Sequence, residues 1–283
     1  MNARGFLDNY SLEITASDVG RLGLVRSVLP PNSAVSITFL PRDDVDELAK
    51  VAVAVRQLGF MPVPHISARR IKSRDHLVSY LQKLRDFADV DRVFVIAGDP
   101  PFPLGPYDDA LAIIRTELLA EFGVRYVGIA GYPEGHPHIS REKLLRAMKD
   151  KLAALAKAGQ NAEIVTQFAF DADVVLAWLA RIRAEGVNTT IRIGLPGPTS
   201  VQSLLHFAAR CGVGVSGKVL AKYGVSITRL LNTATPDMLA RKLSHFLDPN
   251  VHGMVKAHLY PFGGITKTVE WAETFSPVAV PHY

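Results

Sequence analysis

Cysteine is nearly absent from this sequence. The 283 residues contain a single one, Cys211, so an internal disulfide is excluded, and disulfide-stapled small folds are excluded with it. Long hydrophobic runs are also missing, because the apolar stretches fall far short of the roughly 20 residues that span a bilayer. The first ten residues have no continuous apolar stretch before Asp8, which argues against a secretory signal peptide. We therefore expect a cytoplasmic protein without a membrane-spanning segment.

The sequence also lacks a concentrated patch of positive charge. The formal net charge is +5, but the basic residues are spread over predicted helices and form no run with interleaved aromatic residues. This distribution predicts weak attraction for small anions and argues against nucleic-acid binding. The content of 48% apolar and 21% charged residues is that of a folded globular chain. A homo-oligomer is compatible with this composition.

Short apolar segments typical of β-strands recur along the chain, and stretches with helical spacing, such as residues 43–58 and 141–158, separate them. The strand segments are residues 11–16, 34–40, 61–67, 92–98, 125–131, 163–170, 190–196 and 253–262. Alternating strands and helices indicate a parallel sheet, and eight such strands close into a barrel. We therefore predict an α/β fold, a single (β/α)8 TIM barrel over residues 1–283.

Two features refine this prediction. An open doubly wound sheet would require a G-x-G-x-x-G turn after an early strand, and residues 16–20 do not provide it. Residues 212–248 hold two or three helical segments between the seventh and eighth strands, so we expect extra helices there and no second domain.

Polar residues stand where several strands end, which is where TIM barrels carry their chemistry. Glu13 is a carboxylate among apolar neighbours of the first strand, and a raised pKa is expected for it; a salt-bridged structural carboxylate is the alternative. Thr38, His65, Asp99 and Gln167 follow at or near later strand ends. Each alone would more often be a cap or a satisfied core group, but together they favour a site.

The loop after the fifth strand, residues 131–138, contains an aromatic ring, a carboxylate and two imidazoles. A loop without a functional role rarely carries so many such side chains. A zinc site could be imagined from His65, Glu134, His136 and His138. Their spacing matches no standard ligand pattern and no cysteine assists, so we predict no metal.

Glycine-containing turns at residues 194–200 and 212–218 are candidate phosphate-binding loops. The first precedes a helix that Thr199 or Ser200 would cap. Tight turns and helix capping explain both segments equally well.

The ordered series of strand-end motifs resembles the methylenetetrahydrofolate reductase family. Its pieces are Ser11-Leu12-Glu13, Pro64-His65-Ile66-Ser67, Gly98-Asp99-Pro100-Pro101, Tyr132-Pro133-Glu134-Gly135-His136-Pro137, Ala158-Gly159, Thr166-Gln167-Phe168, Gly194-Leu195-Pro196 and His258-Leu259-Tyr260. One piece alone is a weak signal, whereas the ordered series is specific. The resemblance implies an oxidoreductase that interconverts 5,10-methylenetetrahydrofolate and 5-methyltetrahydrofolate. It also implies NAD(P)H, with NADH favoured, as hydride donor and FAD as the family's hydride relay.

The resemblance further implies a role for each motif residue. Glu13 would protonate N10 of the folate, with Asp99 and Gln167 as further catalytic residues. Substrate binding would fall to Gln167, Phe207 and Tyr260. The residues lining the flavin or its replacement would be Thr38, His65, Tyr107, Tyr132 and His136.

The chain departs from the family pattern where FAD phosphates and adenine would be held. Ala97 stands where the family has arginine, and the polar, basic cluster of the helix after the fifth strand is replaced by Lys149, Leu152, Leu155 and Ala156. A pyrophosphate without fixed donors or cations binds poorly in a partly buried groove. We therefore expect weak FAD binding or none, unless Arg69, Arg70 or Lys149 substitutes. The alternative for the whole chain is a barrel that binds folate or flavin without turnover.

Overall fold

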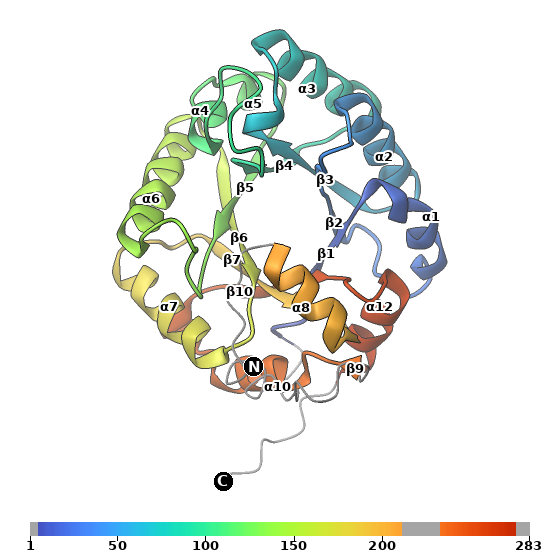
Figure 1. The fold of residues 1–283 in the computed structure, drawn as a ribbon, viewed down its shortest axis with the longest axis vertical. Helices are drawn as coiled ribbons and strands as arrows, with labels where there is room; N and C mark the ends of the chain where they lie inside the picture. Colours follow the sequence, from blue (N-terminus) through green and yellow to red (C-terminus); the bar gives the residue numbers. More distant parts are fainter. Residues whose placement is uncertain (1–4, 211–232, 276–283) are drawn as a thin grey trace.

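The computed structural model describes residues 5–210 and 233–275, and Figure 1 shows a closed barrel of parallel strands inside a ring of helices. The strand order around the barrel is β1-β10-β7-β6-β5-β4-β3-β2, with every neighbouring pair parallel. The barrel strands are β1 (Ser11–Ile14), β2 (Ala34–Ile37), β3 (Met61–Ser67), β4 (Arg92–Ile96), β5 (Tyr126–Gly131), β6 (Asn161–Phe168), β7 (Thr190–Pro196) and β10 (Val255–Tyr260). Two short strands, β8 (Thr199–Ser200) and β9 (Thr233–Ala234), pair antiparallel outside the barrel.

The helices of the described ranges follow the strands around the barrel (Figure 1). They are α1 (Val19–Leu22), α2 (Val45–Gln57), α3 (Arg74–Ala88), α4 (Ala110–Ile114), α5 (Leu118–Glu121), α6 (Arg141–Lys157), α7 (Ala172–Ala184), α8 (Val201–Arg210), α10 (Asp237–Phe246), α11 (Pro249–His252) and α12 (Ile265–Thr274). Short 3-10 turns span Ala16–Asp18, Gly23–Val25 and Ala68–Arg70. Where the chain is described, no helix is long and apolar enough to cross a membrane.

Local sequence explains where the long helices begin. The side chains of Asp44, Ser73, Ser140 and Asp171 each accept a backbone N–H from the first turn of α2, α3, α6 and α7. Apolar residues at helical spacing, such as Leu48, Ala52 and Val55 of α2, are fully buried against the strands.

The predicted fold class is confirmed: all eight predicted strands form the barrel in order, and α2 and α6 occupy the two predicted helical stretches. The extra helices expected between the last two barrel strands include α10 and α11. Cys211 and the turn at residues 212–218 lie outside the described residues. The organisation of residues 1–283 as one domain stays a prediction.

The barrel interior is polar as well as apolar. Arg192 of β7 is buried, and its Nε lies 2.8 Å from Oε1 of Glu163 on β6. It also donates to the backbone carbonyl of Asn9. Residues such as Leu12 and Ile14 are fully buried, while Ser11 and Glu13 alternate with them along β1. The period of two therefore directs the polar set of β1 to one face and its apolar set to the other.

Candidate active site

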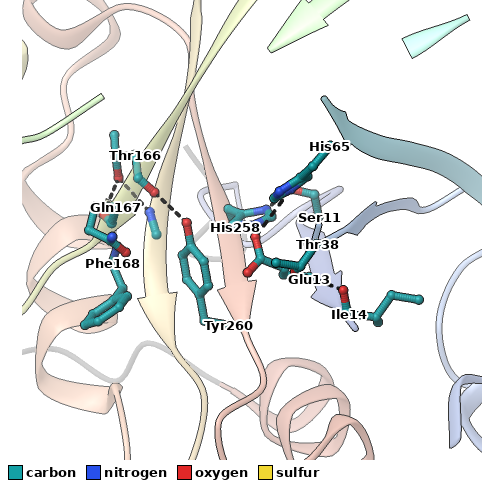
Figure 2. Close-up of polar contacts among 11 residues, drawn as sticks. Ser11, Glu13, Ile14, Thr38, His65, Thr166, Gln167, Phe168, His258 and Tyr260 are labelled. Atoms are coloured by element: carbon teal, nitrogen blue, oxygen red, sulfur yellow. Dashed lines mark hydrogen bonds and ion pairs between the residues drawn. The ribbon is translucent and has the colours of Figure 1, made fainter. Parts of the chain in front are cut away.

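Glu13 lies between two buried histidines, as Figure 2 shows. Its Oε2 atom is 3.6 Å from Nε2 of His65 on β3 and 3.6 Å from Nε2 of His258 on β10. The two imidazoles are 4% and 1% exposed, and the carboxylate is 18% exposed. The barrel therefore holds one partly accessible carboxylate against two groups that solvent barely reaches.

The Ser11 hydroxyl fixes the second of these histidines. Its Oγ atom is 2.7 Å from Nδ1 of His258, and the two residues are direct partners in the pairing of β1 with β10. When the hydroxyl donates to Nδ1, the imidazole proton resides on Nε2, where it faces the carboxylate of Glu13. Ser11, His258 and Glu13 thus form a short polar chain inside the barrel.

The electrostatics of this cluster correct one expectation. Burial raises the pKa of Glu13, but the hydrogen bond from His258, the electrostatic interactions with both histidines and the Thr38 hydroxyl together outweigh burial, so the pKa lies below its ordinary value. The expected raised pKa is therefore wrong. The reason is that apolar neighbours along β1 are visible in the sequence, whereas the two imidazoles come from other strands. Burial lowers the pKa of His65 to about 4, which leaves that ring neutral at pH 7.

A second group of side chains lines a cavity of about 420 Å3 beside β5 and β6. Its polar and aromatic lining is Tyr132, Glu134, His136, Ser140, Arg141, Gln167 and Phe168. The rings of Tyr132 and His136 meet edge to face with centroids 5.4 Å apart. Nδ1 of His136 accepts the backbone N–H of His138, which makes Nε2 the donor of a neutral ring. Three of the predicted site residues, Tyr132, His136 and Gln167, therefore share one cavity.

Glu134 joins the two loops that form this cavity. Its Oε1 atom accepts the backbone N–H groups of Phe170 (2.7 Å) and Asp171 (2.9 Å), which follow β6. Burial raises the pKa of Glu134 despite these two bonds. The sequence had suggested Glu134 only as a metal ligand, and the structure shows it tying the β5 loop to the β6 loop.

The remaining predicted polar residues occupy different surroundings. The Thr38 hydroxyl donates to the Ile14 carbonyl at 3.0 Å, at the end of β1. Asp99 is 61% exposed and its Oδ1 lies 2.5 Å from Nη2 of Arg70. Tyr107 is buried in the hydrophobic core. Neither Asp99 nor Tyr107 lines the 420 Å3 cavity.

The predicted substrate-binding aromatics contact other protein groups. Phe207 of α8 stacks on Phe262, with ring centroids 4.2 Å apart and planes 11° from parallel. Phe262 in turn meets the ring of Phe168 edge-on at 5.0 Å. The Tyr260 hydroxyl donates to the Thr166 carbonyl at 2.9 Å (Figure 2). These rings form one aromatic cluster beside Gln167.

The cations that could have replaced the missing FAD contacts are engaged elsewhere. Arg69 donates to the carbonyls of Asp108 and Pro100, which hold the loop after β4. Arg70 binds Asp99, and the Nζ atom of Lys149 lies 2.7 Å from Oε2 of Glu185. The side chain of Leu155, in the helix where the family carries polar residues, is fully buried. These residues do not fit the phosphates of FAD.

The described ranges, residues 5–210 and 233–275, also bear on metal binding. They contain no group of three or more histidine, cysteine, aspartate or glutamate side chains suited to a metal ion.

Sequence reasoning assigned no role to His258, Ser11, Phe262 or Thr166. A signal for the first two was present, because side chains two apart in a strand share a face. Ser11 therefore shares a face with Glu13, and His258 with Tyr260. Phe262 and Thr166 had no such signal, since their contacts depend on tertiary packing.

The comparisons with known proteins bear on this geometry. A sequence profile described as Methylenetetrahydrofolate reductase matches residues 25–228. The chain belongs to the methylenetetrahydrofolate reductase family. The matched range excludes β1 and β10, so Glu13, His258 and Tyr260 are placed by the barrel and not by the profile.

Curated relatives of this reductase family match over parts of their length. The 5,10-methylenetetrahydrofolate reductase of Pectobacterium carotovorum is 30% identical over 161 residues, which are 56% of this chain and 50% of that protein. Methylenetetrahydrofolate reductase 1 of Schizosaccharomyces pombe is 34% identical over 104 residues, 36% of this chain and 15% of that protein. Methylenetetrahydrofolate reductase (NADH) 1 of Arabidopsis thaliana is 28% identical over 148 residues, 47% of this chain and 24% of that protein. The match thus spans half or less of these relatives.

A solved structure supports the fold of this reductase-family chain. An uncharacterized protein from Clostridium thermocellum that binds two copies of 5-methyl-5,6,7,8-tetrahydrofolic acid superimposes with a TM-score of 0.61. The superposition covers 95% of each chain at 12% identity, so it supports the architecture alone.

Proposed function

We propose that this chain interconverts 5,10-methylenetetrahydrofolate and 5-methyltetrahydrofolate with NAD(P)H, NADH favoured, as hydride donor. The observation that carries the proposal is the Glu13 carboxylate between His65 and His258 in a member of this family. The family match supports a tetrahydrofolate substrate, and the Clostridium thermocellum protein shows that a barrel of this architecture can bind one. The NADH named for the Arabidopsis thaliana relative supports the choice of nicotinamide.

Glu13 is the group that exchanges a proton with N10 of the folate. In the reducing direction, protonation of N10 opens the ring of the methylene bridge and leaves an electrophilic carbon on N5, to which the nicotinamide supplies hydride. In the oxidising direction, the carboxylate accepts the N10 proton as the ring closes. A folate that covers the 18% of Glu13 still exposed removes its remaining water and raises the pKa toward that of a proton donor.

The cavity beside β5 and β6 receives the bound ligands in this proposal. Gln167 hydrogen-bonds the pterin, while Tyr132 and His136 line the nicotinamide side. Phe207 supplies a ring for the aromatic portion of the folate after it separates from Phe262.

We also propose that hydride passes directly from the nicotinamide to the folate. Ala97 and Leu155 stand at positions that would meet FAD, and Arg69, Arg70 and Lys149 are committed to protein acceptors. The cytoplasmic location stays a prediction.

Rapid mixing of the purified protein with NADH and methylenetetrahydrofolate tests the function. We expect NADH absorbance to decay with formation of 5-methyltetrahydrofolate. Folate binding without NADH oxidation would instead support the alternative of a non-catalytic binding barrel.

The visible absorbance spectrum of the dialysed protein tests the hydride route. We expect a colourless protein whose turnover is unchanged by added FAD. Stoichiometric flavin that survives dialysis would contradict direct transfer.

A further inference from the structure

We propose that Thr166, Gly194 and Tyr260 form a brace that holds a bulge in β6 and aims Gln167 into the site. Thr166 is then a positioning residue that acts through Gln167. The inference rests on the proposed function, because it assumes that Gln167 contacts the folate.

The bulge is visible in the pairing of β6 with β7. Val165 pairs with Arg192, and the next pair is Phe168 with Gly194, so two residues of β6 oppose one residue of β7. Such an insertion interrupts the alternation of side chains and is common beside active sites. Gln167 and Phe168 accordingly both line the 420 Å3 cavity, although neighbours in a regular strand point to opposite faces.

The Thr166 hydroxyl replaces a backbone partner that the bulge displaces. Its Oγ1 atom accepts the N–H of Gly194 at 2.9 Å and donates to the carbonyl of Gln167 at 2.8 Å. Thr166 is completely buried, so water cannot take over these two bonds. One hydroxyl thus provides a hydrogen-bond partner for the N–H of Gly194 on β7 and for the carbonyl of Gln167 on β6. It thereby fixes the backbone of Gln167.

Tyr260 completes the brace from β10, on the far side of β7. Its hydroxyl donates to the Thr166 carbonyl at 2.9 Å, as Figure 2 shows. The ring passes so close to Gly194 that a Cβ atom there would lie 2.7 Å from Cε2 of Tyr260 and 2.8 Å from Cα of Phe168. Only glycine leaves room for both the crossing ring and the bulged strand.

This arrangement predicts that the brace controls the place of the Gln167 carboxamide. The Oε1 atom of Gln167 accepts the N–H of Phe168 at 3.1 Å, so the side chain is oriented by the backbone that the brace holds. Loss of the Thr166 hydroxyl leaves the buried N–H of Gly194 and the partly buried carbonyl of Gln167 without this partner, and the bulge relaxes to recover the lost bonds. Gln167 then shifts relative to the folate.

A matched pair of variants tests the role of the hydroxyl. Thr166→Val keeps the shape and removes the hydroxyl, whereas Thr166→Ser keeps it. We expect Thr166→Val to lower kcat/KM for methylenetetrahydrofolate by about 10- to 100-fold, the size of effect that a small misplacement causes, and Thr166→Ser to restore most of it. The affinity for 5-methyltetrahydrofolate, measured without nicotinamide, should fall in the same order.

A double-mutant cycle with Gln167→Ala separates positioning from general stabilisation. If Thr166 acts through Gln167, Thr166→Val should cost little once Gln167 is already removed. An equal cost in both backgrounds would overturn the proposal. If Thr166→Val does not fold, Tyr260→Phe carries the same cycle, since it removes the bond to the Thr166 carbonyl and leaves the β6–β7 contacts in place.

Failure of the proposed function gives a different result. A wild-type protein that neither oxidises NADH with methylenetetrahydrofolate nor binds 5-methyltetrahydrofolate would overturn the function and the brace together. An active wild type with additive variants would overturn only the brace.

Discussion

His258 presents Nε2 to the Glu13 carboxylate at 3.6 Å, and the pairing of β1 with β10 holds this geometry. Ser11 stands opposite His258 in that pairing and occupies its other ring nitrogen. The strand register therefore decides which ring nitrogen of His258 faces Glu13 and brings a hydroxyl to the other. This relationship helps to lower the pKa of the Glu13 carboxyl, and the first three predictions concern that carboxylate.

Replacement of Glu13 by glutamine should nearly abolish turnover with methylenetetrahydrofolate. The amide fills the same space but cannot donate a proton to N10, and a positioned acid typically contributes about 10²- to 10⁴-fold to the rate. Steady-state kinetics measure the loss, and nicotinamide binding should persist. Glu121→Gln, an exposed change on α5, is the matched control and should keep wild-type rates. Full activity in Glu13→Gln would end the assignment of Glu13 as the acid.

The two directions of the reaction should differ in pH dependence. The two histidines lower the pKa of Glu13, so at neutral pH the free enzyme carries the carboxylate. The reducing direction needs the protonated form, and its kcat/KM should therefore fall as pH rises through the neutral range. The oxidising direction needs the carboxylate, so its kcat/KM should stay level there. Parallel profiles for both directions would contradict a proton held by Glu13.

Ser11→Ala should move the reducing profile toward higher pH. Without the hydroxyl at Nδ1, the His258 proton is no longer held on Nε2, so the interaction that lowers the pKa of Glu13 weakens. The pH at which kcat/KM for the reducing direction begins to fall measures this shift in the pKa of Glu13. Ser11→Thr keeps a hydroxyl and should stay close to wild type. An unchanged profile in Ser11→Ala would show that the hydroxyl does not control the carboxylate.

His65 should make the protein less stable in mild acid. Burial lowers its pKa to about 4, so between pH 4 and 6.5 the unfolded chain binds a proton that the folded chain does not. Stability contributed by His65 is therefore lost as pH falls through this window, by about 3 kcal/mol for the full shift. Urea unfolding at pH 7 and pH 4.5 measures the change. His65→Gln should flatten this dependence, and an equally steep loss in the variant would assign it to other groups.

The barrel could be predicted from local pattern because its elements are local. The repeat of two in strands such as β3 and of 3.6 in helices such as α2 follows from backbone geometry, and alternation of the two forces a parallel sheet. The carboxyl ends of the strands then face one side, which is why Glu13 and His65 could be named as neighbours of a site.

Other properties of the site depend on neighbours that only barrel closure supplies. The pKa of Glu13 is lowered because β3 and β10 bring imidazoles to it, and its own strand shows only apolar residues. Phe207 meets Phe262 because α8 lies over the end of β10, so its stacking partner is a protein ring.

The sequence by itself determined the order of strands and helices, the edge at which polar groups gather and the family to which the motifs are similar. Tertiary structure decided the charge state of Glu13, the exposure of Asp99 and the bulge that turns Gln167. Periodicity is a property of consecutive residues, whereas burial, charge and register arise between residues far apart in the chain. Ser11 and His258, at opposite ends of the sequence, become partners only when the first strand closes the barrel against the last.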